Sequence, residues 1–416
     1  MRVLWFSNTA ASGGEYLKIP GVGGGWLSSL DKALRDKVEL HVAFYHPKPS
    51  GDFVHQGVHY YPIYDRHWRW VFLRAKLFRH FTDDEDLPKY LRLVEMIKPD
   101  VIHIHGTENP FGNIIDHTKI PVVVSMQGII NVHYHKFLSG IGQMGLRTKV
   151  LKFGSIADVP FYESFKGRQK LFRKMSNRER LIMSRCKFVI GRTDWDRRVS
   201  RILAPGSVYF RSEEMLRDSF YEDRWAPQEH HALVLHTTNG NSPYKGFETI
   251  CQSLTLLNNL GYNVQWRVAG VRKDDLIVKV ARKLLGKQYP SKGLVLLGPL
   301  TEEPLVQKML EADIYVMPSH IENSPNNLCE AMMLGMPCIA TCAGGTPSLL
   351  KDGEDGILVQ DGDPWALAGA VLELKNDRGK AAKFGETARR KAVSRHNRKK
   401  IVEQQLKVYM QIQRSH

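Results

Sequence analysis

The segment DIYVMPSHIENSPNNLCEAMMLGMPCIAT, residues 313–341, contains the pattern that decides the fold. Its ends are two short apolar runs, DIYVMPS (313–319) and PCIAT (337–341), and the residues between them have helical apolar spacing. A strand, a helix and a second strand in this order predict two parallel strands joined by a crossover helix.

This alternation extends along the whole chain. Further strands are expected at 3–7, 38–45, 100–106, 121–128, 187–193, 231–238, 263–270 and 293–298. Helical patterns lie between them, which predicts an α/β protein with two doubly wound parallel sheets.

The domain bounds follow from the place where the alternation stops. We expect an N-terminal domain at 1–205, a linker at 206–229 and a C-terminal domain at 230–395. Residues 396–416 form a long amphipathic helix, which we expect to pack back toward the N-terminal domain. A chain of 416 residues exceeds what one core usually supports. The two domains imply a central cleft where the carboxyl ends of both sheets meet.

Charge and cysteine content narrow the classes of function. Lys and Arg number 59 and Asp and Glu 43, a net charge of +16, which favours an anionic partner such as nucleic acid, lipid or a phosphorylated small molecule. No apolar run is long enough to span a membrane. The five cysteines include no C-x-x-C pair, so we expect neither a disulfide framework nor a zinc ribbon, and a cytoplasmic protein.

The signals for the start and end of a helix within residues 318–337 show where two glutamates lie relative to that helix. Ser324 can cap a helix that has Pro325 at its first position, and Gly335 suits its left-handed end. Glu322 then lies in the loop before the helix and Glu330 in its second turn. A capped helix with two incidental glutamates is the alternative.

The beginning of this helix is a predicted anion site. Backbone N–H groups near Asn326 and Asn327 are free of helical bonds and carry part of the positive end of the helix dipole. Such a terminus suits a diphosphate.

The segment resembles the Glu–seven residues–Glu motif of retaining nucleotide-sugar glycosyltransferases with the GT-B fold, family 4. Supporting matches are DVIHIHG (100–106), GRTDWDRR (191–198), YKGFETI (244–250) and CAGGTPSLLKDGEDGILVQDGDPWALAGAV (342–371). The resemblance implies that Glu322 contacts the donor sugar and that Glu330 binds ribose hydroxyls. It also implies a donor-binding segment that includes Asn323, Ser324, Asn326, Asn327 and Leu328.

Lys245 lies in TTNGNSPYKGFETICQSL (237–254), where a strand and loop lead into a helix. A lysine there can neutralise a diphosphate leaving group. The resembled family usually has an arginine six residues earlier, where this chain has Asn239. The donor site must therefore use another cation or depend on Lys245 and the helix terminus. An ordinary exposed lysine is the alternative.

Two glycine-containing loops complete the predicted donor site. PGVGGGW (20–26) is not a dinucleotide fingerprint, since Trp26 stands where a third glycine is needed. The resemblance places Gly24 and Gly25 near the donor phosphates, and packing of the turn is the alternative. The loop with Gly298 and Leu300 is expected to hold the base.

Two histidines and a glutamine are candidates for the side of the site that binds the acceptor. Strand alternation puts His103 and His105 on one face. Gln127 occupies the position where family members often carry a histidine near the reacting sugar. Glutamine cannot act as a general base, so we name His105 as the candidate for a proton role and a structural histidine as its alternative.

A metal site and a cofactor are not expected. The cluster Asp83, Asp84, Glu85 and Asp86 leads into Pro88 and is typical of a solvated helix entry. Lys245 and the helix terminus can stabilise the departing diphosphate, and the nucleotide sugar is a substrate.

The basic excess is concentrated in the first half. Residues 166–201 contain 13 Lys and Arg and three Asp and Glu, and WRWVFLRAKLFRHF (68–81) interleaves aromatic and basic residues. Both segments suit an anionic membrane surface. Nucleic acid is the rival partner, although no nucleic-acid-binding signature is present, and a solvated basic face is the third interpretation.

The predicted function is a retaining, metal-independent glycosyltransferase. Its donor is a nucleotide diphosphate sugar, with UDP favoured over GDP. Its acceptor is a glycan or polyprenyl-linked glycan, as in surface polysaccharide or glycoconjugate synthesis at the inner face of the cytoplasmic membrane. Another GT-B enzyme (an epimerase or a phosphorylase) and a non-catalytic basic binding protein are the alternatives.

Overall fold

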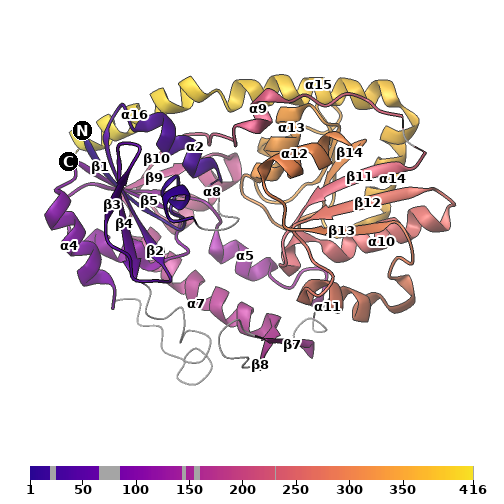
Figure 1. The fold of residues 1–416 in the computed structure, drawn as a ribbon, viewed down its shortest axis with the longest axis horizontal. Coiled ribbons are helices and arrows are strands. Elements are labelled where there is room, and N and C mark those ends of the chain that lie inside the picture. The colour runs from indigo at the N-terminus through magenta and orange to yellow at the C-terminus, as the bar shows by residue number, and fades with distance from the viewer. Residues whose placement is uncertain (19–24, 65–84, 143–146, 154–159, 230, 416) are drawn as a thin grey trace. The chain divides into compact units, whose positions relative to one another are not determined.

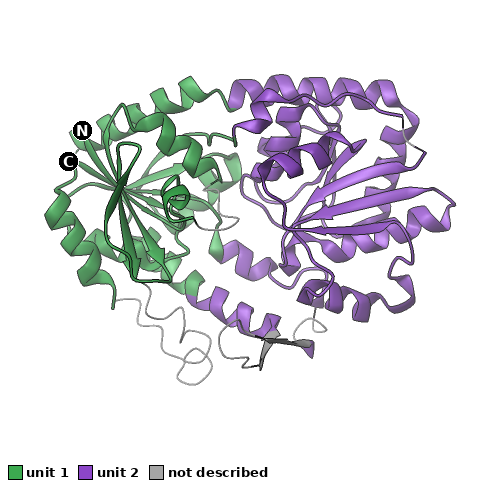
Figure 2. Cartoon of the chain, viewed as in Figure 1, with its two compact units in different colours: residues 1–130, 175–217, 396–416 green, residues 131–174, 218–395 purple. Residues whose placement is uncertain are grey.

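The computed structural model of the chain describes residues 1–18, 25–64, 85–142, 147–153, 160–229 and 231–415. The chain forms two compact units, shown in Figures 1 and 2. Unit 1 comprises residues 1–130, 175–217 and 396–416, and unit 2 comprises residues 131–174 and 218–395.

Unit 1 is built on an eight-stranded sheet in the order β10-β9-β6-β5-β1-β2-β4-β3. Neighbouring strands are parallel except for β3 and β4. The strands are β1 (Arg2–Ser7), β2 (Glu39–His46), β3 (Phe53–His55), β4 (Val58–Tyr64), β5 (Val101–His105), β6 (Val122–Ser125), β9 (Phe188–Gly191) and β10 (Val208–Arg211). β1 is buried from Val3 onward, as a central parallel strand covered on both faces must be.

The order of these strands creates a topological switch point. From β1 the chain adds β2 and β4 on one side, and it then crosses to add β5, β6 and β9 on the other side. The carboxyl ends of β1 and β5 therefore flank the crevice at which open parallel sheets bind ligands.

Helices cover the sheet of unit 1. They are α1 (Gly13–Tyr16), α2 (Gly25–Leu34), α4 (Leu87–Ile97), η1 (Pro110–His117), α8 (Asp194–Leu203) and α16 (Arg398–Arg414). α16 is the last helix of the chain, and it places Ile401, Val408 and Ile412 in the core of unit 1. Helix α7 (Phe165–Met183) begins among the residues of unit 2 and ends among those of unit 1.

Unit 2 contains a six-stranded parallel sheet in the order β13-β12-β11-β14-β15-β16. The strands are β11 (Leu233–Thr238), β12 (Val264–Ala269), β13 (Leu294–Gly298), β14 (Ile314–Met317), β15 (Cys338–Thr341) and β16 (Ile357–Val359). The chain adds β12 and β13 on one side of β11 and β14 to β16 on the other. The switch point of unit 2 therefore lies between the carboxyl ends of β11 and β14.

The remaining elements belong mainly to unit 2. They are α5 (Ile130–Lys136), α9 (Ser219–Glu222), η2 (Pro243–Lys245), α10 (Phe247–Asn259), α11 (Leu276–Leu285), η3 (Gly286–Gln288), α12 (Glu302–Leu310), α13 (Asn326–Leu334), η4 (Thr346–Ser348), α14 (Pro364–Asn376) and α15 (Arg378–Arg395). A separate antiparallel pair is formed by β7 (Lys149–Phe153) and β8 (Pro160–Ser164). In the described part of the chain, no helix is long and apolar enough to cross a bilayer.

All ten strands expected from the sequence are present. The division of the chain into two domains, however, differs from the expected one. Residues 208–211, predicted as linker, form β10 at the edge of the first sheet. This short strand is half exposed, so its sequence lacks the apolar run of a central strand. Residues 131–174 group with unit 2, because Phe137, Ile141 and Phe165 are buried in its core.

Candidate functional site

Two loops meet at the switch point of unit 2, one after β11 and one after β14. Lys245 Nζ lies 2.6 Å from Glu322 Oε1. The Glu322 side chain is 8% exposed and that of Lys245 is 25% exposed. Burial opposes the charge of Lys245, but the adjacent Glu322 carboxylate outweighs it and raises the pKa of Lys245. The loops therefore hold a lysine whose charge is stabilised by the neighbouring carboxylate.

Glycines allow these loops to approach closely. Gly246 has φ 70°, and a Cβ at this residue would lie 2.0 Å from Pro318 O. Gly344 has φ 56°, and its Cβ would lie 2.0 Å from Glu322 O, which also accepts the Gly345 N–H at 2.9 Å. Side chains at 246 and 344 would push the Glu322 loop away, so the position of its carboxylate depends on both glycines.

Helix α13 follows the Glu322 loop and spans Asn326–Leu334. The prediction that Ser324 caps it is wrong, because Pro325 has ψ 111° and is itself the extended residue before the helix. Gly335 ends the helix in the left-handed conformation, φ 83°, as expected. Glu330 lies in the second turn and is buried.

The N-terminus of α13 is directed by an asparagine. Asn327 Nδ2 donates to Thr238 O at the end of β11 (2.8 Å), and its Oδ1 accepts the Leu328 N–H (3.0 Å). Within the described residues, the backbone N–H groups of Asn326 and Asn327 have no hydrogen-bond partner. They present the positive end of the helix at the switch point, where an anion can bind.

Asn239 stands where the resembled family has an arginine, and its amide is used inside the loop. Its Nδ2 donates to Lys245 O (3.2 Å), and its Oδ1 accepts the Gly240 N–H (2.8 Å). The side chain thus shapes the loop that carries Lys245. Arg272, which sequence reasoning missed, follows β12 at the same edge of the sheet, and its Cγ lies 3.6 Å from where a Cβ of Gly298 would be.

The predicted base-binding loop begins at this edge. Gly298 ends β13 with φ 69°, and its N–H donates to Val271 O at 3.1 Å. Leu300 follows and is half buried. The role of this loop remains a prediction.

A charged network behind the two loops was not found from the sequence. His320 Nε2 contacts Glu248 Oε1 at 2.6 Å, and its Nδ1 lies 3.4 Å from Asp361 Oδ2. Lys136 contacts the same Asp361 oxygen at 3.4 Å. Burial disfavours the imidazolium, but Glu248 outweighs it and raises the pKa of His320. The backbone N–H of His320 also donates to Tyr244 O (2.8 Å). His320 therefore links the two loops next to Lys245 and Glu322.

The histidines of unit 1 lie on one face of β5, as predicted. The ring centroids of His103 and His105 are 3.8 Å apart. His103 bonds Tyr409 Oη (2.7 Å) and Ser125 Oγ (2.6 Å), which makes it structural. His105 is 2% exposed, and neither ring nitrogen has a hydrogen-bond partner in the described part of the chain. Burial lowers the pKa of His105 well below its usual value, so its imidazole is neutral.

Gln127 is joined to a buried ion pair. Its Oε1 accepts Arg192 Nη1 at 3.2 Å, and Arg192 also pairs with Glu214. Treating Arg192 as part of a basic surface was wrong, because both partners are buried. Gly25 begins α2 with φ 53°, whereas Gly24 lies outside the described residues.

Among the described residues, no group of three or more His, Cys, Asp or Glu side chains could hold a metal ion. Asp86 directly precedes α4, where it pairs with Lys89 and accepts the Tyr45 hydroxyl at 2.9 Å. Asp83 and Asp84 lie outside the described residues.

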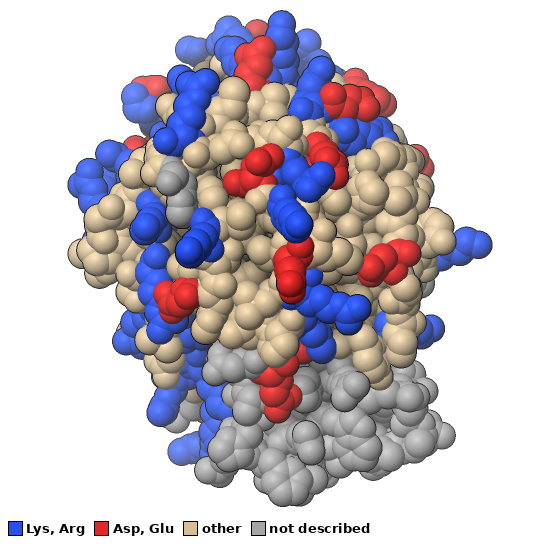
Figure 3. Space-filling view, turned by 90° about the vertical axis from the view of Figure 1, so that its left-hand side faces the viewer, with Lys and Arg blue, Asp and Glu red and all other residues tan. Residues whose placement is uncertain are grey.

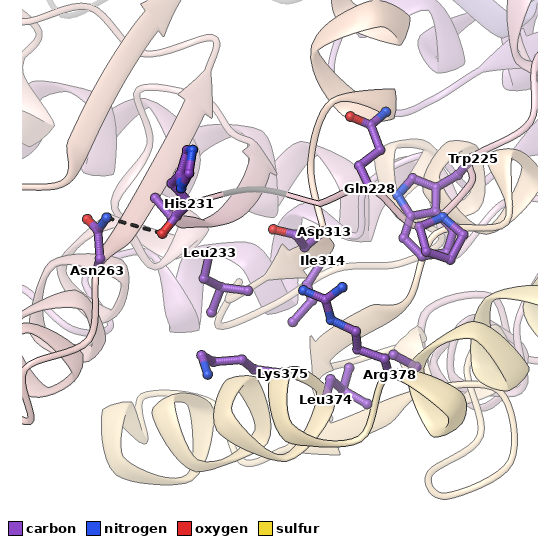
Figure 4. Close-up of a pocket in the computed structure, with 13 residues that line it drawn as sticks. Trp225, Gln228, His231, Leu233, Asn263, Asp313, Ile314, Leu374, Lys375 and Arg378 are labelled. Carbon is purple, nitrogen blue, oxygen red and sulfur yellow. Dashed lines mark hydrogen bonds between the residues drawn. The ribbon is translucent and has the colours of Figure 1, made fainter.

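A pocket of about 370 Å³ lies at the opposite edge of the sheet of unit 2, where β11 and β14 begin. Figure 4 shows Trp225, Arg378 and Lys375 around it. Its place at the amino ends of the strands separates it from the Lys245 and Glu322 loops.

Comparisons with known proteins agree with this architecture. Residues 229–391 match the family model described as Glycosyl transferases group 1. A similar protein is the Staphylococcus aureus capsular polysaccharide biosynthesis glycosyltransferase CapM, 27% identical over 165 residues, which are 40% of this chain and 42% of CapM. Another is the Bacillus anthracis N-acetyl-alpha-D-glucosaminyl L-malate synthase, 29% identical over 113 residues, 27% of this chain and 30% of the relative. The match thus spans less than half the length of either relative.

Solved structures match over the full length. Sucrose-phosphate synthase from Thermosynechococcus elongatus superposes with a TM-score of 0.72 at 14% identity, covering 100% of both chains. Anabaena HepE in complex with UDP-glucose gives a TM-score of 0.64 at 16% identity, covering 97% of this chain and 98% of HepE.

The two α/β units, each built on a mainly parallel sheet, have the GT-B fold. Residues 229–391, less than half of the chain, are similar to the glycosyl transferases group 1 family.

Proposed function

We propose that this protein is a retaining glycosyltransferase that uses a nucleotide diphosphate sugar, a UDP-sugar in preference to a GDP-sugar. The observation that carries the proposal is the Lys245–Glu322 pair, 2.6 Å apart, beside the open N-terminus of α13. A cation and a helix terminus at one edge suit a diphosphate, and the carboxylate suits the hydroxyls of the donor sugar. The HepE complex with UDP-glucose supports the same donor class.

The chemical work is electrostatic. As the sugar leaves, negative charge develops on the diphosphate, and Lys245 with the α13 N–H groups stabilises that charge without a metal. Glu322 orients the sugar, and Glu330 accepts hydrogen bonds from the ribose. In the same-face mechanism, the leaving phosphate oxygen takes the acceptor's proton, and this chemistry retains the anomeric configuration.

We propose a glycan or polyprenyl-linked glycan as acceptor, for surface polysaccharide or glycoconjugate synthesis at the inner face of the cytoplasmic membrane. Helix α8 supports membrane docking, because Arg197, Arg198 and Arg201 are exposed beside Ile202, which is 81% exposed. On the face seen in Figure 3, however, Lys and Arg are interspersed with Asp and Glu. The contact is therefore expected to be local, and segment 68–81 lies outside the described residues.

Titration calorimetry with UDP, GDP, UDP-glucose, UDP-N-acetylglucosamine and GDP-mannose tests the proposal. Binding of one nucleotide and its sugar, followed by transfer with retained configuration, is the expected result. No binding of any nucleotide would reject it in favour of a binding protein, whereas pyridoxal-phosphate absorbance or sugar epimerisation would identify the other GT-B classes.

A further inference from the structure

The pocket at the amino ends of β11 and β14 lies within unit 2 and takes no part in the proposed donor chemistry (Figure 4). β11 is six residues long, so about 20 Å separates this edge of the sheet from the edge that carries Lys245 and Glu322. Ile314, Leu374 and Ala381 form the apolar base of the pocket, and each is at most 7% exposed. A volume of about 370 Å³ falls in the range of pockets that bind small molecules.

Two cations line this pocket without acidic partners. Arg378 is the first residue of α15, and in Figure 4 its side chain points toward Asp313 and Ile314. Among the described residues, neither Arg378 nor Lys375 of α14 forms an ion pair or a hydrogen bond. Lys375 lies against the Tyr262 ring, with its Nζ 5.2 Å from the ring centre. A bound anion can therefore neutralise both charges.

The remaining walls supply a hydrogen-bond acceptor and an aromatic ring. Asp313 is the one acid among the described residues that line the pocket. Its Oδ2 accepts the Val234 N–H at 2.8 Å, and its Oδ1 forms no hydrogen bond within the described part of the chain. Trp225 is half buried, and its backbone and indole N–H groups donate to Leu334 O (2.8 Å) and Ala312 O (2.7 Å). These bonds hold the indole ring in place, so its apolar surface is available to a ligand.

We propose that this pocket binds a small phosphate monoester whose organic part carries hydroxyl groups. A phosphate monoester has a charge of about −1.5 to −2 at pH 7, which suits two cations, and a guanidinium can bind two of its oxygens together. The hydroxyl groups can donate to the open Asp313 oxygen, and the C–H groups can pack against Trp225. Inorganic phosphate would bind the cations alone and leave the carboxylate and the ring unused. The pocket contains no residue of the donor loops, so the inference goes beyond the proposed function and does not depend on it.

Titration calorimetry on the full chain tests the site with glycerol 3-phosphate, glucose 1-phosphate, glucose 6-phosphate and N-acetylglucosamine 6-phosphate. Inorganic phosphate and glucose are the comparison ligands, and we expect at least one ester to bind more tightly than both. Arg378→Gln should weaken binding of that ester about tenfold, the lower end for a hydrogen bond to a charged group, because Arg378 is exposed. Arg390→Gln, which removes another exposed arginine of α15, is the matched control and should bind the ester like wild type.

Three results overturn the proposal: no ester binds wild type, inorganic phosphate or glucose binds as tightly as the best ester, or Arg378→Gln binds that ester with wild-type affinity. If Arg378→Gln does not fold, Lys375→Gln replaces it, and wild-type affinity in that variant overturns the proposal equally.

Lys245→Met distinguishes this pocket from the donor site. It should bind the ester like wild type, and an ester that loses affinity in Lys245→Met but not in Arg378→Gln occupies the donor site, which also overturns the proposal. Arg378→Gln should bind UDP normally. A wild type that binds an ester in this pocket but no nucleotide would reject the proposed function alone.

Discussion

Lys245→Met removes the cation of the predicted donor site and keeps much of the length of the side chain. In the wild type, Lys245 Nζ is fixed 2.6 Å from Glu322, so it does not have to be ordered when a diphosphate binds. A hydrogen bond to a charged group contributes about 1.5–3 kcal/mol. We therefore expect the variant to bind UDP about ten- to a hundredfold more weakly.

The same change should lower the stability of the ligand-free protein. Glu322 would lose its cationic partner in a site where its side chain is only 8% exposed. Removing one partner of a fully buried pair costs about 3–5 kcal/mol. Because Lys245 is 25% exposed, water reduces this effect, and we expect a loss of about 1–2 kcal/mol. Adding Glu322→Gln should recover most of that loss but none of the affinity.

Calorimetry with UDP and urea unfolding measure the two effects. Lys308→Met is the control, because it also removes a lysine from unit 2, where Lys308 pairs with Glu311 on the exposed side of α12. UDP binding to Lys245→Met at wild-type affinity would refute the assignment. A stability loss in Lys245→Met with unchanged UDP affinity would show that the ion pair is structural only.

Four further predictions follow from the site and the surface. Glu330→Gln should weaken UDP binding about tenfold by calorimetry, since a charged acceptor of ribose hydroxyls becomes neutral. Sugar transfer should persist in excess EDTA, and a loss that Mg²⁺ restores would assign the diphosphate to a metal. Because the pKa of His320 is raised in the folded protein, its contribution to stability should be complete below about pH 6.5 and be lost as pH rises through the folded-state pKa. Urea unfolding from pH 6 to 9 should therefore show a smaller decline in the free energy of unfolding for His320→Gln than for the wild type. Co-sedimentation with anionic liposomes should fall at high salt and on neutralising Arg197, Arg198 and Arg201 together, and equal binding to neutral liposomes would reject docking.

The strands could be predicted where the sequence has an unbroken apolar run, and less well where a strand is short or alternates between apolar and polar residues. The ten expected strands lie mainly inside the two sheets, where burial on both faces requires unbroken apolar sequence. Of the strands in the two sheets, β3, β4, β10 and β16 were not expected. β3, β10 and β16 lie at sheet edges, whereas β4 lies inside the first sheet and alternates between buried and half-buried residues. The grouping of residues 131–174 with unit 2 depends on tertiary packing of side chains such as Phe137, which no local pattern records.

The sequence allowed us to predict which residues lie at the site, but not which other side chains they contact. Spacing placed Glu322 before α13 and Glu330 within it, and a loop lysine at 245. The contact between His320 and Glu248 joins residues 72 positions apart, so only the fold shows it. Likewise, Arg192 looks like one more surface cation in a basic stretch until its burial against Glu214 is known.

For the proposed donor, the loops at the switch point of unit 2 also explain how one lysine can serve a doubly charged leaving group. The Asn239 amide donates to Lys245 O and accepts the Gly240 N–H, so it fixes the shape of the loop. An arginine at this position would instead have added a positive charge. That shape brings Lys245 to Glu322, and Asn327 aims the start of α13 at the end of β11. In the proposed donor complex, the diphosphate would meet a preorganised lysine and a helix terminus, and preorganisation rather than the number of charges would supply the stabilisation. Substitutions that loosen this loop should therefore impair the donor site as much as substitutions that remove charge.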